Sequence, residues 1–216
     1  MSGTIHVNRI RLAGTAVSAA IADARAVATD ADASTVIWWV GDRATPESLG
    51  QELAARGLAH LQRLTGLTLA REPTGEAALA ARPCSSLDQF TAAQELDWSV
   101  TALAEEKRAR LRERLAEQWE REGRFGRTFV VEERGEVISA GRAHFGPDAV
   151  FLTGGATAPH ARRRGAYTSL VHARWHEALA RGTPLLVTQA SDASRPILAR
   201  LGFDAVGTID LYRDTI

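Results

Sequence analysis

The succession of strand and helix patterns predicts an α/β (α+β) fold in which helices flank a central sheet. Two strand patterns, residues 128–132 and 137–141, enclose Glu133-Arg134-Gly135-Glu136, a sequence typical of a β-hairpin turn. An extended run at 150–152 leads through a basic, glycine-containing loop into a helical period, which indicates a strand–loop–helix unit. The apolar run 185–188 predicts a further, buried strand.

The first third of the chain predicts a smaller set of elements. Residues 9–29 are rich in alanine with apolar residues at helical intervals, so we expect a helix there. The continuously apolar run 35–40 predicts a buried strand. Thr45-Pro46 predicts a helix start, with threonine as N-cap and proline at the first helical position, and Gly57 predicts its end. Residues 58–69 read as two short strands with a turn between them.

Further elements precede and follow the hairpin. Residues 78–84 predict a weak strand, and a capped helix begins after Ser85. A long helix is expected from about 101 to 122, where a stripe of apolar side chains runs among many charges. A short helix is expected over 194–202, and residues 203–212 should supply two closing strands.

Composition excludes several classes of protein. The 216 residues include 26 basic and 26 acidic ones, which argues against a nucleic-acid or membrane surface as the main partner. Cys84 is the only cysteine, so the sequence provides neither an intramolecular disulfide nor a cysteine-cluster zinc site. No apolar run approaches the roughly 18 residues of a membrane span, and the N-terminus lacks a signal peptide. We therefore expect a cytoplasmic protein.

The stretch from 150 to 167 carries the main functional signal. Gly154 and Gly155 interrupt the strand pattern, which marks a bulge or the close approach of a ligand. Arg162-Arg-Arg-Gly165 precedes a helix that begins at Ala166, where unpaired N–H groups and the helix dipole favour an anion. The alternative is a solvated turn with a glycine for geometry. Neither a Walker loop nor a dinucleotide-binding fingerprint is present.

This loop resembles a known signature. The run Ala156-Thr-Ala-Pro159, followed by Arg162-x-x-Gly165, resembles the acyl-CoA signature of the GNAT superfamily of N-acetyltransferases. In that family an Arg/Gln-x-x-Gly-x-Gly/Ala loop wraps the CoA pyrophosphate; here Tyr167 occupies the last position and narrows the space near the phosphates. Residues 194–203 resemble the family's terminal helix and Gly-Phe strand start. The order of elements over 76–216, about two thirds of the chain, matches the GNAT layout.

The resemblance implies a GNAT-type fold: a mixed, mostly antiparallel central sheet flanked by helices, with a splayed parallel strand pair at the CoA site. Residues 75–216 would form this domain, and residues 1–74 a smaller, partial GNAT-like α/β segment. The segment 39–58 faintly repeats the pattern of 187–203, although any helix that begins at proline and ends at glycine looks similar. Because it lacks a basic glycine loop, the N-terminal segment should bind no second CoA.

The resemblance also implies acetyl-CoA as the co-substrate, and we expect no metal. Strand 150–156 would supply backbone groups to the pantetheine arm and the thioester, and the amides of 163–167 would bind the pyrophosphate. The Gly154-Gly155 bulge would splay this strand from strand 185–188 and open a slot. The expected cofactor-binding residues are Leu152, Thr153, Gly154, Ala156, Thr157, Arg162, Arg163, Arg164, Gly165, Ala166, Tyr167 and Ser194.

The catalytic acid and base have less specific signals. Many family members use a tyrosine of the terminal helix as general acid, and Leu198 stands at that position here. His144, near the end of one hairpin strand, and Glu132, on its partner, are candidates to relay a proton through water. Ser194 or a neighbour replaces the family's asparagine and is a third candidate. The alternative for His144 is a surface residue at a strand end.

The predicted function is direct transfer of an acetyl group from acetyl-CoA to a primary amine of a small molecule or peptide, in a ternary complex. That reaction needs reactants held in line, a neutral amine, and donors for the thioester oxygen. A non-catalytic acyl-CoA-binding or sensing protein, and a plain nucleotide-phosphate binder, are the alternatives. No pattern in the sequence specifies the acceptor amine, and a homodimer is compatible with it.

Overall fold

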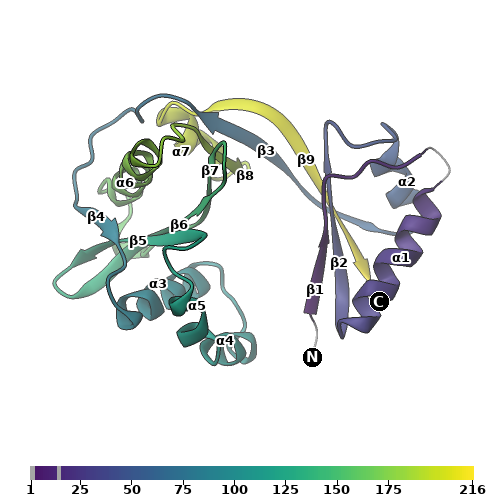
Figure 1. Cartoon of the computed structure of the whole chain (residues 1–216), viewed down its shortest axis with the longest axis horizontal. Helices are drawn as coiled ribbons and strands as arrows, with labels where there is room; N and C mark the ends of the chain where they lie inside the picture. The colour runs from purple at the N-terminus through teal and green to yellow at the C-terminus, as the bar shows by residue number, and fades with distance from the viewer. Residues whose placement is uncertain (1–2, 14–15) are drawn as a thin grey trace. The chain divides into compact units, whose positions relative to one another are not determined.

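The computed structural model describes residues 3–13 and 16–216. Contacts within the chain divide it into two compact units, each of which is described by itself (Figure 1). The first unit comprises Met1–Leu67, Gln189–Pro196 and Ala205–Ile216, and the second comprises Thr68–Thr188 and Ile197–Asp204. Segments from both ends of the sequence therefore build the first unit, and the middle of the sequence builds most of the second.

The first unit is a four-stranded sheet with two helices. Its elements are β1 (Gly3–Val7), α1 (Val17–Asp30), β2 (Ala33–Gly41), α2 (Leu49–Ala55), β3 (Ala59–Leu69) and β9 (Asp204–Thr215). The strand order is β1-β2-β9-β3, with β1 and β2 parallel and β2 and β9 antiparallel. Val36 and Trp38 of β2 are buried with Leu49 and Leu53 of α2 in one apolar cluster, which α1 also joins. The predicted strand 35–40 is confirmed by β2.

The two helix starts predicted for the first unit are wrong. The predicted helix 9–29 begins only at Val17: Arg11 forms a β-bridge with Thr45, and Arg9 has φ of +53°, which no right-handed helix contains. The predicted helix start at Thr45-Pro46 also fails. Thr45 donates its backbone N–H to the Ile10 carbonyl and its carbonyl accepts from Leu12, so α2 begins three residues after Pro46. Gly57 ends α2 as predicted, with φ of +87°.

The strand pairs predicted at 58–69 and 203–212 are each one continuous strand, β3 and β9. Gly66, at the turn predicted within 58–69, lies inside β3, and Gly207 lies inside β9. A Cβ on Gly66 would make an ordinary contact of 3.6 Å with the Gly207 carbonyl oxygen, whereas a Cβ on Gly207 would lie 2.7 Å from Oδ2 of Asp42.

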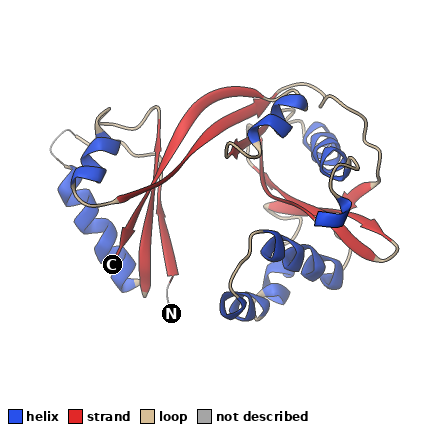
Figure 2. Ribbon diagram, turned by 180° about the vertical axis from the view of Figure 1, so that it is seen from behind, coloured by secondary structure: helices blue, strands red, loops and turns tan. Residues whose placement is uncertain are grey.

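The second unit contains a sheet with helices on both faces (Figure 2). Its elements are β4 (Ala81–Pro83), α3 (Leu87–Val100), α4 (Glu105–Arg112), α5 (Leu115–Glu120), β5 (Gly126–Glu133), β6 (Glu136–Phe145), β7 (Val150–Thr157), a 3₁₀ turn (Pro159–Ala161), α6 (Ala166–Ala180), β8 (Leu186–Ala190) and α7 (Arg195–Arg200). The last two elements cross the unit boundary. The strand order is β8-β7-β6-β5-β4, antiparallel except for the parallel pair β7–β8. This mixed, mostly antiparallel arrangement confirms the predicted fold class.

The two faces of this sheet are identified by their contacts. Ala140 of β6 packs with Ala93 of α3 on one face. On the other face, a Cβ on Gly141 would lie 2.8 Å from Nη1 of Arg174 in α6. Arg174 is fully buried, its Nε donates to the Leu170 carbonyl, and burial lowers the pKa of its guanidinium. Gly141 is therefore required to leave room for a buried cation.

The predicted hairpin is confirmed, and the predicted helix 101–122 is not continuous. Arg134 and Gly135 both have positive φ, which gives the two-residue turn that the sequence indicates. Between α3 and α4, Ala102 has φ of +52°, a conformation that no helix continues through. The helix is interrupted again before Leu115, and this interruption lets Leu115 and Trp119 pack against Phe90 of α3.

Candidate active site

A bulge interrupts β7 where the sequence predicts one. Thr153 lies opposite Arg142 and Ala156 lies opposite Ala140, so Gly154 and Gly155 together face the single residue Gly141. Gly154 has φ of +61°, which is accessible to glycine at little cost. The ladder between β7 and β8 is described only at Val150–Leu186 and Phe151–Val187, before the bulge. The parallel pair is thus splayed beyond Phe151, as predicted.

The loop after β7 ends in an unblocked helix N-terminus. Gly165 precedes α6 with φ of +81°, and a Cβ there would lie 3.2 Å from the Ala78 Cβ. No side chain caps the helix, and its first turn contains no acid. In the described part of the chain, the backbone N–H groups of Ala166, Tyr167 and Thr168 donate to no protein acceptor. Such amides, together with the helix dipole, attract an anion.

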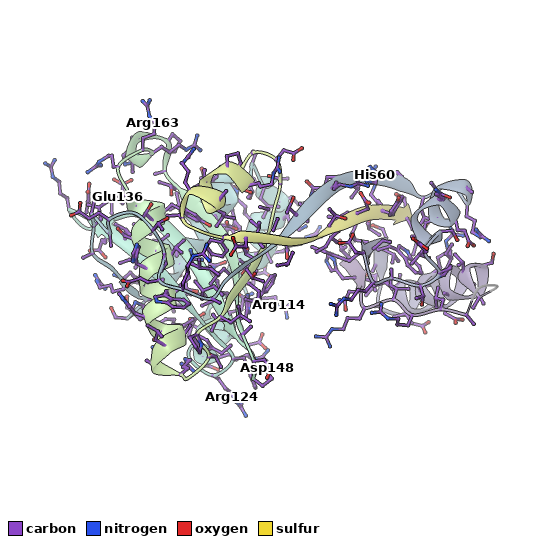
Figure 3. All side chains as sticks on the ribbon, turned by 90° about the horizontal axis from the view of Figure 1, so that it is seen from above. His60, Arg114, Arg124, Glu136, Asp148 and Arg163 are labelled. Carbon is purple, nitrogen blue, oxygen red and sulfur yellow. The ribbon has the colours of Figure 1, made fainter. Side chains whose placement is uncertain are left out.

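The three consecutive arginines of the loop have different surroundings. Arg164 Nη2 donates to both carboxylate oxygens of Glu133, at 2.6 and 2.8 Å, and so ties the loop to the hairpin. Arg162 Nε donates to the Thr157 carbonyl at 3.4 Å. Arg163 has φ of +63° and its side chain extends away from the loop into solvent (Figure 3). Only Arg163 therefore has a guanidinium without a described protein partner.

Tyr167, which departs from the family pattern, is turned toward the sheet. A Cβ on Gly155 would lie 2.6 Å from Cε2 of Tyr167, so the ring occupies the space that this glycine leaves. On its other side the Arg174 guanidinium lies 5.8 Å from the ring centroid. The bulge thus accommodates the larger side chain next to the helix N-terminus.

The other residues expected along β7 have identifiable partners. Thr188 of β8 donates its hydroxyl to the Leu152 carbonyl at 3.0 Å. Ser139 of β6 donates its hydroxyl to the Ala156 carbonyl at 2.8 Å and contacts the Thr157 hydroxyl at 2.7 Å. These hydroxyl groups compensate for ladder bonds that β7 loses near its bulge.

His144 lies beside the bulge. Its Nε2 and the Thr153 hydroxyl share a hydrogen bond of 2.9 Å, and its ring is tilted against Phe151 at 6.2 Å between centroids. Burial lowers the pKa of the His144 imidazole, and the nearby Arg142 acts in the same direction. His144 is therefore biased toward the neutral form, which can accept a proton.

The structure does not bring Glu132 near His144. Glu132 accepts from Gln89 at 2.5 Å and from Arg82 at 3.2 Å. It pairs with Val137, seven residues before His144 on β6, a separation of about 23 Å at the usual rise of a strand. The two candidates thus lie toward opposite ends of the hairpin.

Ser194 and Leu198 lie in the terminal helix segment. The Ser194 hydroxyl contacts the Ser191 hydroxyl at 3.4 Å and donates to the Ser191 carbonyl at 3.3 Å. By its contacts, Ser194 belongs to the first unit. Leu198, at the position of the family tyrosine, is 2% exposed and therefore part of the core.

Asp97 is a candidate that sequence reasoning missed. Its Oδ1 lies 3.9 Å from the position that a Cβ on Gly154 would occupy, so its carboxylate faces the bulge. Among the described residues, this half-buried carboxylate has no hydrogen-bond or ion-pair partner, and burial raises its pKa. A signal existed in the sequence: Phe90, Ala93 and Asp97 follow helical spacing, so one acid stands on an otherwise buried face of α3.

Two classes of feature are not found in the described residues. No group of three or more histidine, cysteine, aspartate or glutamate side chains could hold a metal ion in residues 3–13 and 16–216. Within the same ranges, no helix combines the length and apolar character needed to cross a membrane.

Comparison with solved structures identifies the fold. A GCN5-related N-acetyltransferase from Kribbella flavida matches with a TM-score of 0.74 and 17% identity, covering 95% of this chain and 77% of that one. A functionally unknown conserved protein from Staphylococcus epidermidis matches with a TM-score of 0.70 and 8% identity, covering 93% and 81%. A tandem GNAT protein from the clavulanic acid biosynthesis pathway matches with a TM-score of 0.63 and 18% identity, covering 92% and 69%.

Comparison of the sequence with families identifies membership. No match was found among curated proteins. The family model described as "Acetyltransferase (GNAT) family" matches residues 88–203, which is 116 of 216 residues and includes the bulge, the loop and the terminal helix. Because this match spans more than half of the chain, the protein belongs to the GNAT acetyltransferase family.

Proposed function

We propose that this protein transfers an acetyl group from acetyl-CoA to a primary amine of a small molecule or peptide, in a ternary complex. The observation that carries the proposal is the unblocked N-terminus of α6 directly after a bulged strand that separates from its parallel neighbour. The first feature suits a pyrophosphate, and the second offers backbone groups to an extended arm.

The residues of the loop fit the phosphate end of acetyl-CoA. The amides of Ala166 and Tyr167 would donate to the pyrophosphate, and Arg163 would add a mobile positive charge. A side chain at position 165 would be strained by the positive φ and would press on Ala78. Glycine at this position would leave the helix N-terminus open to the phosphates. β7 from Leu152 to Thr157 would bind the pantetheine arm. The co-substrate supplies the acetyl group as a thioester.

Asp97 and His144 would prepare the amine on the α3 face of the sheet. Asp97 faces Gly154 and His144 is bonded to Thr153, so the two side chains flank one short stretch of β7. Asp97 would hold the acceptor as its ammonium ion, because a half-buried carboxylate without a partner gains most from a cation. Neutral His144 would take the proton that the ammonium loses before the nitrogen attacks the thioester carbon.

In this proposal no side chain of the terminal helix donates a proton to the leaving thiolate. Leu198 has no proton to give, and a thiol whose pKa is close to a free cysteine's ~8.5 is a fair leaving group when water protonates it. Glu132, which Arg82 and Gln89 engage, would stabilise the pairing of β4 with β5 instead of acting on the amine.

The first unit would be a partial GNAT-like half. Residues 1–74 supply a strand, a helix, a strand, a helix and the strand β3, without a glycine loop of the 162–165 type. The match over 92% of this chain to a tandem GNAT protein supports this assignment of residues 1–74 and 75–216. The segment would be structural with respect to acetyl transfer.

The test measures turnover of acetyl-CoA with a panel of primary amines, and release of the CoA thiol is the signal that reports turnover. At acetyl-CoA near 100 times its Kd, we expect stabilisation by roughly 2.7 kcal/mol as well as turnover with at least one amine. His144→Gln should lower kcat by about 100-fold without changing acetyl-CoA affinity. Stabilisation by ATP and none by acetyl-CoA would contradict the proposal.

A second function is favoured by one observation. Leu198 stands where many family members have a tyrosine, so the protein could be a non-catalytic acyl-CoA sensor. That function predicts acetyl-CoA binding without thiol release for any amine of the panel. Secondary amines and hydroxylamine should be included, because a sensor would leave all of them unmodified.

A further inference from the structure

The first unit contains a cavity that acetyl transfer does not use. The cavity has a volume of about 680 Å³, within the range of small-molecule sites. Its lining residues belong to the segment that follows β1 and to the end of β2 and the segment after it. β1 and β2 run parallel (Figure 1). Ligands of α/β proteins commonly bind at the carboxyl ends of parallel strands. The lining residues that matter here are Asn8, Arg9, Arg11, Trp39, Arg43 and Ile209.

Positive charge at this cavity is not compensated. Arg9 and Arg43 have no described hydrogen-bond or ion-pair partner, and Arg11 bonds only the neighbouring Ile10 carbonyl. The two loops contain two acids, Asp42 and Glu47, and neither lines the cavity. Asp42 accepts from the Thr208 amide and hydroxyl, and these bonds lower its pKa. It therefore remains charged but is directed at Thr208.

Other arginines of the same unit are neutralised. Arg25 pairs with Asp214 at 2.7 Å, and Arg63 pairs with Asp210 at 2.8 Å. Arg56 pairs with Glu52 at 3.3 Å. Arg195 and Arg213 of this unit also have no described partner, but neither lines the cavity. Arg9, Arg11 and Arg43 gather around one cavity, which is the arrangement that an anionic ligand requires.

The backbone holds these arginines in a defined frame. The Arg11–Thr45 bridge joins the two loops, and the Thr45 amide donates to the Ile10 carbonyl at 3.2 Å. Ile10 is 5% exposed and anchors its loop in the core, between two arginines whose side chains are exposed. Arg9 has φ of +53°, an unfavourable conformation for a residue other than glycine. Such strain, fixed by its surroundings, is frequent at ligand sites.

Trp39 adds a flat apolar wall. Its indole Nε1 donates to His6 Nδ1 at 2.9 Å, which fixes the orientation of the ring. The side chain is only partly buried, and Ile209 lines the cavity from β9. Tryptophan is the side chain best suited to stack on a planar group next to charged contacts.

We propose that this cavity binds a small organic phosphate that carries a flat ring, the chemistry of a nucleoside diphosphate. Arg9, Arg11 and Arg43 bind the phosphates, and Trp39 stacks on the ring. CoA contains the same chemistry in its nucleotide half, so either source would suit the site. Binding of CoA here would use guanidinium groups in place of the basic glycine loop, whose absence from this segment predicts that it binds no second CoA. The proposal is independent of acetyl transfer, because none of these residues belongs to the loop after β7.

The test uses the full-length chain and ADP, titrated by calorimetry. A Gly165→Val background removes binding at the α6 loop, so that any remaining saturable site is the new one. ADP should bind in this background, and the added pair Arg9→Gln and Arg43→Gln should weaken it at least about tenfold, as should high salt. Arg56→Gln, an arginine of the same unit that has an acid partner, is the matched control and should change nothing.

Three further binding measurements identify the chemical class of the ligand. Ribose 5-phosphate and adenosine should each bind at least about tenfold more weakly than ADP, since each lacks one half of the recognised chemistry. Trp39→Leu should weaken ADP but not ribose 5-phosphate. CoA against ADP in the Gly165→Val background identifies the preferred source. No saturable ADP binding, binding unchanged in the Arg9/Arg43 variant, or equal affinity for ribose 5-phosphate would overturn the proposal.

Discussion

The two units offer positive charge to a ligand by different means. In the second unit, the loop before α6 offers backbone amides, because Gly165 turns the chain into the helix without a capping side chain. One of the three arginines in this loop, Arg164, is hydrogen-bonded to Glu133. In the first unit, the loops after β1 and β2 offer side chains, since Arg9 and Arg43 have no described partner.

This difference decides which substitutions matter. A site made of amides depends on backbone dihedrals and tolerates changes of individual side-chain charges. A site made of guanidinium groups depends on those charges and on salt. Arginine side chains therefore have unequal importance in the two units, and four measurements test this comparison.

The largest effect is expected from removal of the first unit's N-terminal segments. A fragment of residues 73–216 retains β9 but lacks both of its neighbours, β2 and β3. An unpaired twelve-residue strand should make this fragment aggregate. A fragment of residues 73–204, which also lacks β9, should be more soluble in the same sedimentation assay. If residues 73–216 stay monomeric and acetylate as the full chain does, the N-terminal segments are a separable module.

Next in size is the effect of Gly165→Val on CoA binding. The variant should lose at least about 100-fold in affinity, two tenfold steps or about 2.8 kcal/mol, because valine disfavours φ of +81° and would press on Ala78. Gly135→Val is the matched control: its φ is also +81°, but nothing lies within 4 Å of its Cβ position. Calorimetry that finds unchanged CoA affinity for Gly165→Val would remove the amide site.

Asp97→Asn should separate stability from activity. Burial raises the pKa of Asp97 in the folded protein. The ionised carboxylate therefore destabilises the folded state, and this effect is fully present once the pH is above that pKa. The asparagine variant should therefore melt at a higher temperature than wild type at pH 7, and this advantage should shrink toward pH 3. Its kcat/KM for the amine should fall by about 10–100-fold while KM for acetyl-CoA stays unchanged.

Asp97→Glu is the control, since it keeps the charge and should recover part of the activity. An Asn variant that is as active as wild type would exclude Asp97 from the acceptor site. A variant that is less stable at pH 7 would mean that the carboxylate has a stabilising partner.

The smallest effect is expected from Ser194→Ala. Because Leu198 offers no proton and water protonates the thiolate in our proposal, no side chain of the terminal helix should be essential. The kcat should fall by less than about tenfold, under 1.4 kcal/mol of activation free energy. Steady-state kinetics that find a loss of several hundredfold, with CoA affinity preserved, would identify Ser194 as a catalytic donor.

The sequence alone was sufficient to predict the local backbone structure of residues 150–167 and of the hairpin. Gly154 and Gly165 act through their own positive φ, and the turn residues Arg134 and Gly135 do the same. Each of these signals lies within a few residues of the structure that it specifies. Hydrophobic periodicity and local composition are therefore enough to predict that structure. The mixed sheet was implied by the resemblance to the GNAT family, whose layout the order of the elements matches.

Only the tertiary structure decided how distant segments pair. Gly66 lies at a turn predicted from the sequence, yet it is inside the long strand β3, and Gly207 inside β9 leaves room for the Asp42 carboxylate of a distant loop. Asp97 becomes a candidate for the site only because α3 packs over the Gly154 bulge. β9 completes the sheet of the first unit, between β2 and β3, although it is far from both in sequence. Strand pairing and burial are chosen by the free energy of the whole fold, and no local pattern encodes the partner.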